Sequence, residues 1–159
     1  MKKKSHVEPI SHNLYIIVRN DLPSLNAGKA MAHAAHAANH FTTKWGHLEI
    51  VQEWLETGDG FGTTIALAAD KDTITKRIQR AAMYDGSVPF GPVWDKTYPF
   101  ITTTEIAALI PKRTLTAEPI FKDDGKVVLF RRELTAGYLF VVEGSQAQLD
   151  LTGDLPLHP

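Results

Sequence analysis

The sequence predicts an α/β protein with a mixed, mostly parallel four-stranded sheet, helices on both faces of that sheet, and a C-terminal β-hairpin. Two observations support this fold class. Short apolar runs, typical of buried strands, alternate along the chain with longer segments whose apolar residues recur at helical spacing. The length of 159 residues also suits a single domain with a substantial hydrophobic core.

The first strand and the helix after it give the clearest local signals. Residues 14–18 (LYIIV) form a continuous apolar run, long enough for a buried central strand. The polar, proline-broken segment 19–23 follows as a loop. Asn26 then suits the N-cap of a helix over 26–41, in which no β-branched residue occurs before Thr42. Ligands often bind at such a junction between a strand and the amino end of a helix.

This helix is expected to have one polar and one apolar side. At about 100° per residue, one stripe of its surface collects Lys29, His33, His36 and His40. The other side is apolar and mostly small: Ala30, Met31, Ala34, Ala35, Ala37, Ala38 and Phe41. We expect the alanine side to lie on the sheet, and the stripe either to be an ordinary solvated face or to line a groove. No metal site is expected, because the helix has no acidic or cysteine residue to complete a ligand set.

The later elements continue the alternation of helices and strands. We expect a helix over 48–57, a strand over 63–69, a helix from its cap Asp70 to about Tyr84, a strand over 90–94 that Pro92 keeps short or near an edge, and a strand over 106–110. The outer side of the third helix is basic, with Lys71, Lys76, Arg77 and Arg80. Those cations are either solvated or in contact with phosphate.

The C-terminal third predicts an added hairpin. Apolar runs over 127–131 and 138–142 flank the segment ELTAG, which suits a turn, and 153–159 suits a loose tail. We therefore expect three parts: a flexible basic tail over 1–12, an α/β domain over 13–111, and a hairpin extension with its tail over 112–159, packed on the same domain.

Composition narrows the functional classes. A formal net charge of −1 argues against a general nucleic-acid coat protein but permits a local basic patch. The absence of cysteine excludes disulfides and thiol catalysis. The basic start lacks the apolar region of a signal peptide, and no apolar run reaches membrane-spanning length, so we expect a cytoplasmic protein without a membrane partner.

A second stretch with potential chemistry is Asp95-Lys96-Thr97-Tyr98-Pro99. Asp95 follows the carboxyl end of an expected strand, where catalytic carboxylates often lie. Equally, its carboxylate could accept hydrogen bonds from the N–H groups of its own loop.

Two motifs around the first helix resemble the signature of the second class of peptidyl-tRNA hydrolases. That signature reads R-x-D-L and then G-K-x-A-A-Q-x-x-H-A. The present chain has Arg19-x-Asp21-Leu22 and then Gly28-Lys29-x-x-Ala32-His33-x-x-His36-Ala37-Ala38. The seven-residue step from Lys29 to His36 is therefore the same, whereas His33 replaces the family's Gln.

The resemblance extends over 13–111, with further departures. Asp95 stands where the family has the Asp of a D-x-G-x-T loop, although Asp95-Lys96-Thr97 has no glycine. Residues 106–111 (IAALIP) are similar to the family's closing T-V-L-A-I-G-P strand. The departures alter the rim of the expected active site, and 112–159 lie outside the family pattern.

The resemblance implies hydrolysis, by an activated water, of the ester that joins a peptidyl or N-blocked aminoacyl group to tRNA. On this hypothesis the catalytic residues are Lys29, His36 and Asp95, and the substrate-binding residues are Arg19, Asp21, His33, Thr97 and Thr103. Lys29 would supply positive charge to the oxyanion or a phosphate, and His36 or Asp95 would activate the water. No metal or cofactor is expected, tRNA is the expected partner, and a homodimer is possible.

Two other functions fit the same residues. The chain could be a catalytically inactive RNA- or protein-binding module, with the altered Asp95 loop marking the loss of hydrolysis. It could also hydrolyse a different small ester or amide. The combination of Lys29, His36 and Asp95 favours an enzyme, since a pure binding module has no evident need for it.

Overall fold

The computed structural model describes residues 11–159. The first ten residues of the expected basic tail over 1–12 lie outside this range, and His12 already belongs to the first strand. Within the described part the chain forms five strands, five α-helices and one short 3₁₀ turn. In chain order they are β1 (His12–Arg19), α1 (Ala27–Trp45), α2 (Glu49–Thr57), β2 (Thr64–Ala69), α3 (Lys71–Ala81), β3 (Phe90–Thr103), α4 (Thr104–Leu109), η1 (Lys112–Thr114), β4 (Leu115–Phe121), β5 (Lys126–Val142) and α5 (Gln146–Thr152).

The strands form one mixed sheet in the order β2-β1-β5-β3, with β4 paired to the outer part of β5. β1 and β2 run parallel, whereas β5 runs antiparallel to β1, β3 and β4. The α/β class is therefore confirmed, but the expected mostly parallel, four-stranded arrangement is wrong. The reason is β5, which returns between β1 and β3 and makes most of the pairings antiparallel.

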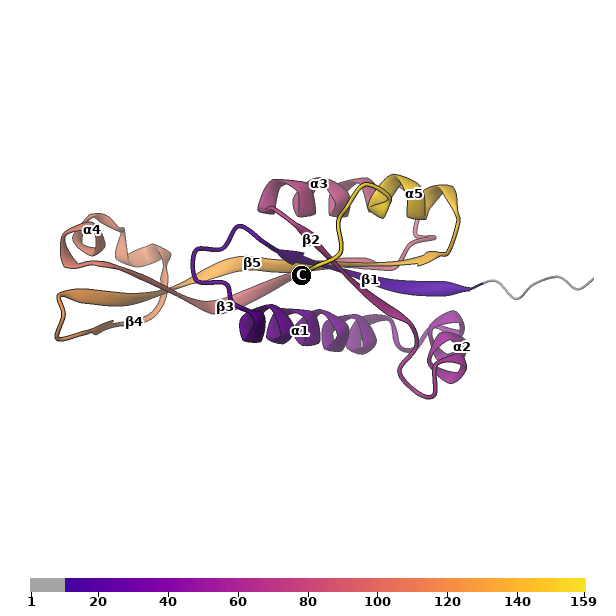
Figure 1. Cartoon of the computed structure of the whole chain (residues 1–159), viewed down its shortest axis with the longest axis horizontal. Coiled ribbons are helices and arrows are strands. Elements are labelled where there is room, and N and C mark those ends of the chain that lie inside the picture. Colours follow the sequence, from indigo (N-terminus) through magenta and orange to yellow (C-terminus); the bar gives the residue numbers. More distant parts are fainter. Residues whose placement is uncertain (1–10) are drawn as a thin grey trace, which may run out of the picture.

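The sheet lies between two layers of helices. In Figure 1, α1 and α2 cover one face, and α3 and α5 cover the other. β1 contributes to both cores because its side chains alternate: Leu14 and Ile16 pack toward α1, whereas Tyr15 and Ile17 pack toward α3. This double burial explains the continuous apolar run of the strand.

Helix α1 begins where we expected, but it is rotated about its axis. The Asn26 side chain caps the helix by accepting a hydrogen bond from the Lys29 N–H. The buried side consists of Ala30, His33, Ala37 and Phe41. Met31, which we assigned to the apolar side, is 68% exposed. The prediction that His33 lies on the polar face is thus wrong, because helical spacing of 3, 4 and 4 residues joins it to those three apolar positions.

The C-terminal hairpin expected to turn at residues 133–137 is wrong, because β5 runs straight through this segment. Residues 133–137, the ELTAG segment, do not turn but continue one strand from Lys126 to Val142, and all five are buried. Gly137 serves packing here, because a Cβ atom at this position would lie 3.0 Å from the Ile74 side chain and 3.1 Å from that of Ile78. The glycine that suggested a turn therefore allows α3 to approach the sheet closely.

The expected strand over 106–110 is also wrong, because α4 occupies this segment. The Thr103 side chain caps that helix by accepting from the Ile106 N–H at 3.4 Å, and a short apolar run does not by itself distinguish strand from helix. The preceding strand β3 is longer than expected and includes the presumed Asp95 loop. Pro92 is compatible with it because β3 lies at an edge of the sheet.

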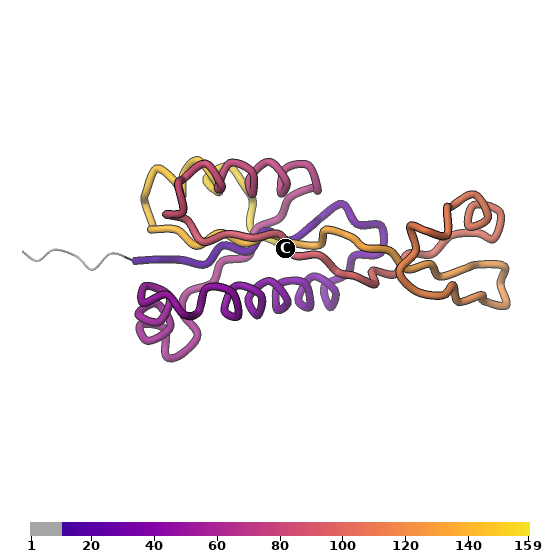
Figure 2. Tube along the Cα trace, turned by 180° about the vertical axis from the view of Figure 1, so that it is seen from behind, coloured from indigo at the N-terminus to yellow at the C-terminus, as the bar shows by residue number. Residues whose placement is uncertain are grey.

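The outer parts of β3 and β5 project from the body together with α4, η1 and β4, and we call residues 96–132 the arm (Figures 1 and 2). In Figure 2 the arm extends beyond the amino end of α1. A hairpin does exist here, between β4 and β5, at a place different from the one expected.

The C-terminal residues are held against β2 rather than loose. The Ala68 N–H donates to the Pro156 carbonyl at 2.9 Å, and the His158 N–H donates to the Ala66 carbonyl at 3.0 Å. The outer edge of β2 is therefore partly covered. Among the helices of residues 11–159, none has the length and apolar character needed to cross a membrane.

Replacing Phe41 by alanine tests the core between α1 and the sheet. Phe41 is fully buried against the rings of Trp54, Tyr138 and Phe140. We expect Phe41→Ala to lower the free energy of unfolding by about 3–5 kcal/mol, measured by urea denaturation. Phe121→Ala, at an arm residue that is 71% exposed, is the control and should leave the midpoint nearly unchanged. Equal effects of the two variants would contradict this account of the core.

Candidate functional site

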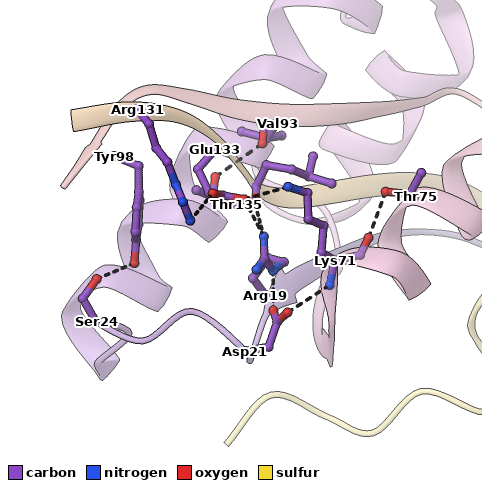
Figure 3. Close-up of polar contacts among 11 residues, drawn as sticks. Arg19, Asp21, Ser24, Lys71, Thr75, Val93, Tyr98, Arg131, Glu133 and Thr135 are labelled. Atoms are coloured by element: carbon purple, nitrogen blue, oxygen red, sulfur yellow. Dashed lines mark hydrogen bonds and ion pairs between the residues drawn. The ribbon is translucent and has the colours of Figure 1, made fainter. Parts of the chain in front are cut away.

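Arg19 ends β1 with its guanidinium in the interior. The residue is 5% exposed. Its Nη1 donates to Glu133 Oε1 at 3.0 Å and to the Leu134 carbonyl at 2.8 Å, and its Nε donates to Asp21 (Figure 3). The R-x-D pair therefore joins β1 to β5 and holds the loop that leads to α1.

Glu133 is the centre of this network and is 4% exposed. Besides Arg19, it pairs with Lys71 Nζ at 3.2 Å and with Arg131 Nη2 at 2.8 Å. Burial alone would raise the pKa of the Glu133 carboxyl, but the hydrogen bonds from Arg19 and Lys71 and the charge of Arg131 outweigh burial and lower the pKa. Glu133 is therefore ionised at neutral pH, and it fixes three cations from three elements.

Asp21 ties the same loop to α3. Its Oδ2 accepts from the Lys71 backbone N–H at 3.5 Å, near the amino end of that helix. Burial acts to raise the pKa of Asp21, but the hydrogen bond and charge of Arg19 bring it below the ordinary value. The loop after β1 is thus held by charged contacts on both sides.

Lys29 lies beside the loop, in the first turn of α1. Its Nζ is 5.4 Å from the centroid of the buried Tyr98 ring, which β3 contributes. The Tyr98 hydroxyl is 2.7 Å from Ser24 Oγ, which also donates to the Pro99 carbonyl at 3.5 Å. These contacts orient the amino end of α1 toward β3.

His33 lies one turn further along α1 and is 4% exposed. Its ring centroid is 5.8 Å from that of Tyr98 and 6.3 Å from that of His36. Within residues 11–159 neither ring nitrogen has a hydrogen-bond partner. Burial lowers the pKa of His33, the charge of Asp95 opposes that effect, and the charges of His36 and Lys29 add to it. His33 is therefore neutral at pH 7.

Asp95 sits at a bulge of β3, where the pairing with β5 shifts register between Asp95 and Tyr98. One carboxylate oxygen accepts from the Thr97 N–H at 2.9 Å. Asp95 is half-buried and pairs in register with Glu133. The carboxylate thus holds its own bulge, one of the two roles that we considered, while its charge acts on the His33 ring.

Not every expected site residue lies here. Thr103 caps α4 and is eight residues beyond Asp95 along β3, which places it about 25 Å away. His40 packs near Tyr138, with 5.6 Å between the ring centroids, and does not join the group. Thr97 is exposed next to Asp95. Among residues 11–159, no group of three or more side chains that could ligate a metal occurs.

Sequence analysis missed Glu133, Lys71 and Tyr98. Glu133 was assigned to a turn, although a single carboxylate inside an apolar run, opposite an arginine at the end of another such run, is a signal of a buried ion pair. Lys71 was counted among the cations of a solvated helix face. Tyr98 lies in a segment expected to be a loop, so the sequence does not predict the alternation of side chains along β3 that buries its ring on the same side as His33.

Comparison with known proteins adds the family. The sequence profile described as Peptidyl-tRNA hydrolase PTH2 matches residues 12–122, more than two thirds of the chain. The chain belongs to the PTH2 family. The match includes Arg19, Lys29, His36 and Asp95 and confirms the resemblance seen in the motifs, whereas Glu133 lies beyond its end.

Other comparisons give less. A solved structure titled as a protein of unknown function from Agrobacterium tumefaciens strain C58 is 13% identical to this PTH2 chain, covers 94% of it and 98% of its own chain, and has a TM-score of 0.46. Among curated proteins, none matches the chain.

Removing the Glu133 carboxylate should destabilise the protein strongly. In Glu133→Ala the buried Arg19 loses one of its two carboxylate partners, and Lys71 and Arg131 lose theirs, so we expect the free energy of unfolding to fall by about 3–5 kcal/mol in urea denaturation. Asp124→Ala removes the partner of the exposed Lys126 and should leave the midpoint nearly unchanged. A small effect of Glu133→Ala would show that the network does not hold β1 to β5.

His33 should make stability depend on pH below neutrality. An unfolded chain binds the His33 proton near pH 6.5, whereas burial lowers the pKa in the fold. Between the two values the unfolded state binds more protons, so the free energy of unfolding falls as the pH decreases below about 6.5. We expect His33→Gln to reduce the dependence of the free energy of unfolding on pH, measured from denaturation curves at several values between about pH 4.5 and 7. An unchanged slope would contradict the burial of a neutral imidazole.

Proposed function

We propose that this protein hydrolyses the ester between a peptidyl or N-blocked aminoacyl group and the terminal ribose of tRNA. Peptidyl-tRNA hydrolysis is the activity after which the PTH2 family is named. The single observation that supports it best is the grouping at the amino end of α1. The His33 ring centroid is 6.3 Å from that of His36 and 5.8 Å from that of Tyr98. Lys29 Nζ is 5.4 Å from the Tyr98 centroid, and Asp95 precedes Tyr98 by three residues on β3.

Lys29 has the role of stabilising negative charge. Its ammonium extends from the first turn of α1, where free backbone N–H groups also favour anions. As water adds to the ester carbonyl, the oxygen becomes negatively charged, and a fixed cation close to it lowers the barrier. An adjacent phosphate of the tRNA would meet the same charge.

The water is activated by His36 or by Asp95. His36 is exposed and can accept a proton from water, and Asp95 keeps one carboxylate oxygen that is not engaged with Thr97. The new C–O bond forms from the water oxygen, and the bond to the ribose oxygen breaks. The proton then passes to the ribose oxygen, which leaves as a hydroxyl.

Arg19 and Asp21 have a positioning role. They fix the loop before α1 and therefore the direction of Lys29. We assign the binding of polar substrate groups to Thr97, which is exposed beside Asp95, and to His33, whose buried ring nitrogens have no hydrogen-bond partner among residues 11–159. Thr103 is left out of this assignment because of its distance.

One observation favours the alternative of an inactive binding module. The Asp95 carboxylate holds its own bulge through Thr97, a structural task that requires no catalysis. Asp95→Asn separates the two roles, since the amide oxygen can still accept from the Thr97 N–H but has no negative charge. A catalytic Asp95 predicts loss of turnover in this variant, whereas a purely structural Asp95 predicts that turnover is retained.

Lys29→Ala tests the proposed reaction. We expect kcat/KM for N-acetyl-aminoacyl-tRNA to fall by a factor of about 100 or more, because charge stabilisation in the transition state is lost. Release of the acyl group is measured by acid precipitation of labelled substrate. Met31→Ala changes an exposed position two residues away and should keep full activity. An unaffected Lys29→Ala enzyme, or an intact protein that releases no acyl group, would overturn the proposal.

A further inference from the structure

Five cations lie near the base of the arm, and we call them the neck cluster: Lys96, Lys112, Arg113, Arg131 and Arg132. All five side chains are exposed. Arg131 has an acidic partner, Glu133. Within residues 11–159 the other four form no ion pair, so their charges are available to a ligand.

Strand pairing places these residues close together. Arg131 on β5 pairs with Tyr98 on β3 on one side and with Leu115 on β4 on the other. Lys96 precedes Tyr98 by two residues, and η1, which carries Lys112 and Arg113, directly precedes Leu115. Neighbouring strands are about 4.8 Å apart, so the cluster spans three adjacent strands, with the side chains of the consecutive residues Arg131 and Arg132 on opposite faces of β5.

The cluster adjoins the candidate site. Tyr98, whose ring contacts Lys29, is the cross-strand partner of Arg131, and Asp95 is the neighbour of Lys96. Positive charge therefore continues from the amino end of α1 across the base of the arm.

The arm is also the positive part of the molecule. Residues 96–132 contain seven Lys and Arg against four Asp and Glu, a balance of +3, so the rest of the chain carries −4 to give the total of −1. By contrast, three of the four cations on the basic face of α3 form ion pairs with other residues of the described chain. Lys71 pairs with Glu133, Arg77 with Asp154 and Arg80 with Asp150. The phosphate contact that we considered for α3 therefore has less free charge available than the neck.

Two of the neck arginines lie over aromatic rings. The Arg132 guanidinium is 4.8 Å from the centroid of Trp94, and that of Arg131 is 4.7 Å from the centroid of Phe100. Stacking restricts a guanidinium to one orientation while its N–H groups remain free to bind oxygen. The cluster thus combines two stacked arginines with the exposed side chains of Arg113 and two lysines.

We propose that the neck cluster binds the phosphate backbone of the RNA whose acylated end enters the candidate site. This inference rests on the proposed function and extends it by assigning RNA contacts to residues of the arm. Exposed, unpaired cations on adjacent strands favour a polyanion with regularly spaced charges, and binding releases the counterions of its phosphates. An acidic protein is the competing partner, and the experiment below separates it from RNA.

The test uses Lys112→Ala/Arg113→Ala, because neither side chain has a hydrogen bond or ion pair within residues 11–159. We expect the dissociation constant for N-acetyl-aminoacyl-tRNA in about 0.1 M salt to rise at least about tenfold. The slope of log affinity against log salt should become shallower by about 1.4–1.8, since two phosphate contacts are lost. KM should rise for the tRNA substrate, while kcat stays unchanged.

Two controls make the outcome decisive. Lys44→Ala/Lys76→Ala removes the same charge from exposed positions on α1 and α3 and should change neither affinity nor slope. N-acetyl-aminoacyl-adenosine has the ester but no phosphate backbone, so the neck variant should hydrolyse it at the rate of the intact protein.

Three results would overturn the proposal. The first is an unchanged tRNA affinity and salt slope in the neck variant, as expected if an acidic protein is the true partner. The others are an equal loss of tRNA affinity in the control variant, or an equal loss of activity of the neck variant on the adenosine ester. If the intact protein hydrolyses neither substrate, the proposed function fails. The affinity for uncharged tRNA and its salt slope then still decide whether the neck binds RNA.

Discussion

The buried ion pair between Arg19 and Glu133 is the constraint on which the site depends. Taking a carboxylate and a guanidinium out of water is unfavourable unless each keeps good partners, and here Glu133 meets three cations while Arg19 also donates to Asp21 and a carbonyl. Such a network has little freedom to rearrange, because any displaced partner would leave a buried charge. The network therefore fixes the loop after β1, the start of α3 and the base of the arm relative to one another. Because α1 follows that loop, the same network determines the position of Lys29.

The close fit of α1 on the sheet explains why the site contains a buried imidazole. Alanines on the inner side of the helix let it approach, which brings His33 against Tyr98 and excludes water from its ring. A neutral His33 adds no charge next to Lys29. The electrostatic field around the candidate site therefore comes from Lys29, Asp95 and the neck cations and not from a protonated His33.

Local sequence signals were sufficient for half of the fold. β1 and β2 were predicted from continuous apolar runs, and α1, α2 and α3 from helical spacing, with the caps Asn26 and Asp70 marking where α1 and α3 begin. β5 was not, since the same glycine signals either a turn or a close packing contact, and only the position of α3 decides between them. For the site, the family resemblance pointed to Lys29, His36 and Asp95 as candidates. The partners of Arg19 in β5, Glu133 and the Leu134 carbonyl, lie more than a hundred residues away, and no local pattern relates them to β1.

β5 also determines how the chain is divided. The family match ends at residue 122, yet residues 133–142 lie between β1 and β3 and supply Glu133. Without that strand, β1 and β3 would be separate edges, and Arg19 would lose its contacts with Glu133 and the Leu134 carbonyl. We therefore propose that 11–159 form one cooperative unit rather than a domain with an extension. Because Arg131 of the neck cluster also pairs with Glu133, a ligand that binds Arg131 would act on the same network that positions Lys29.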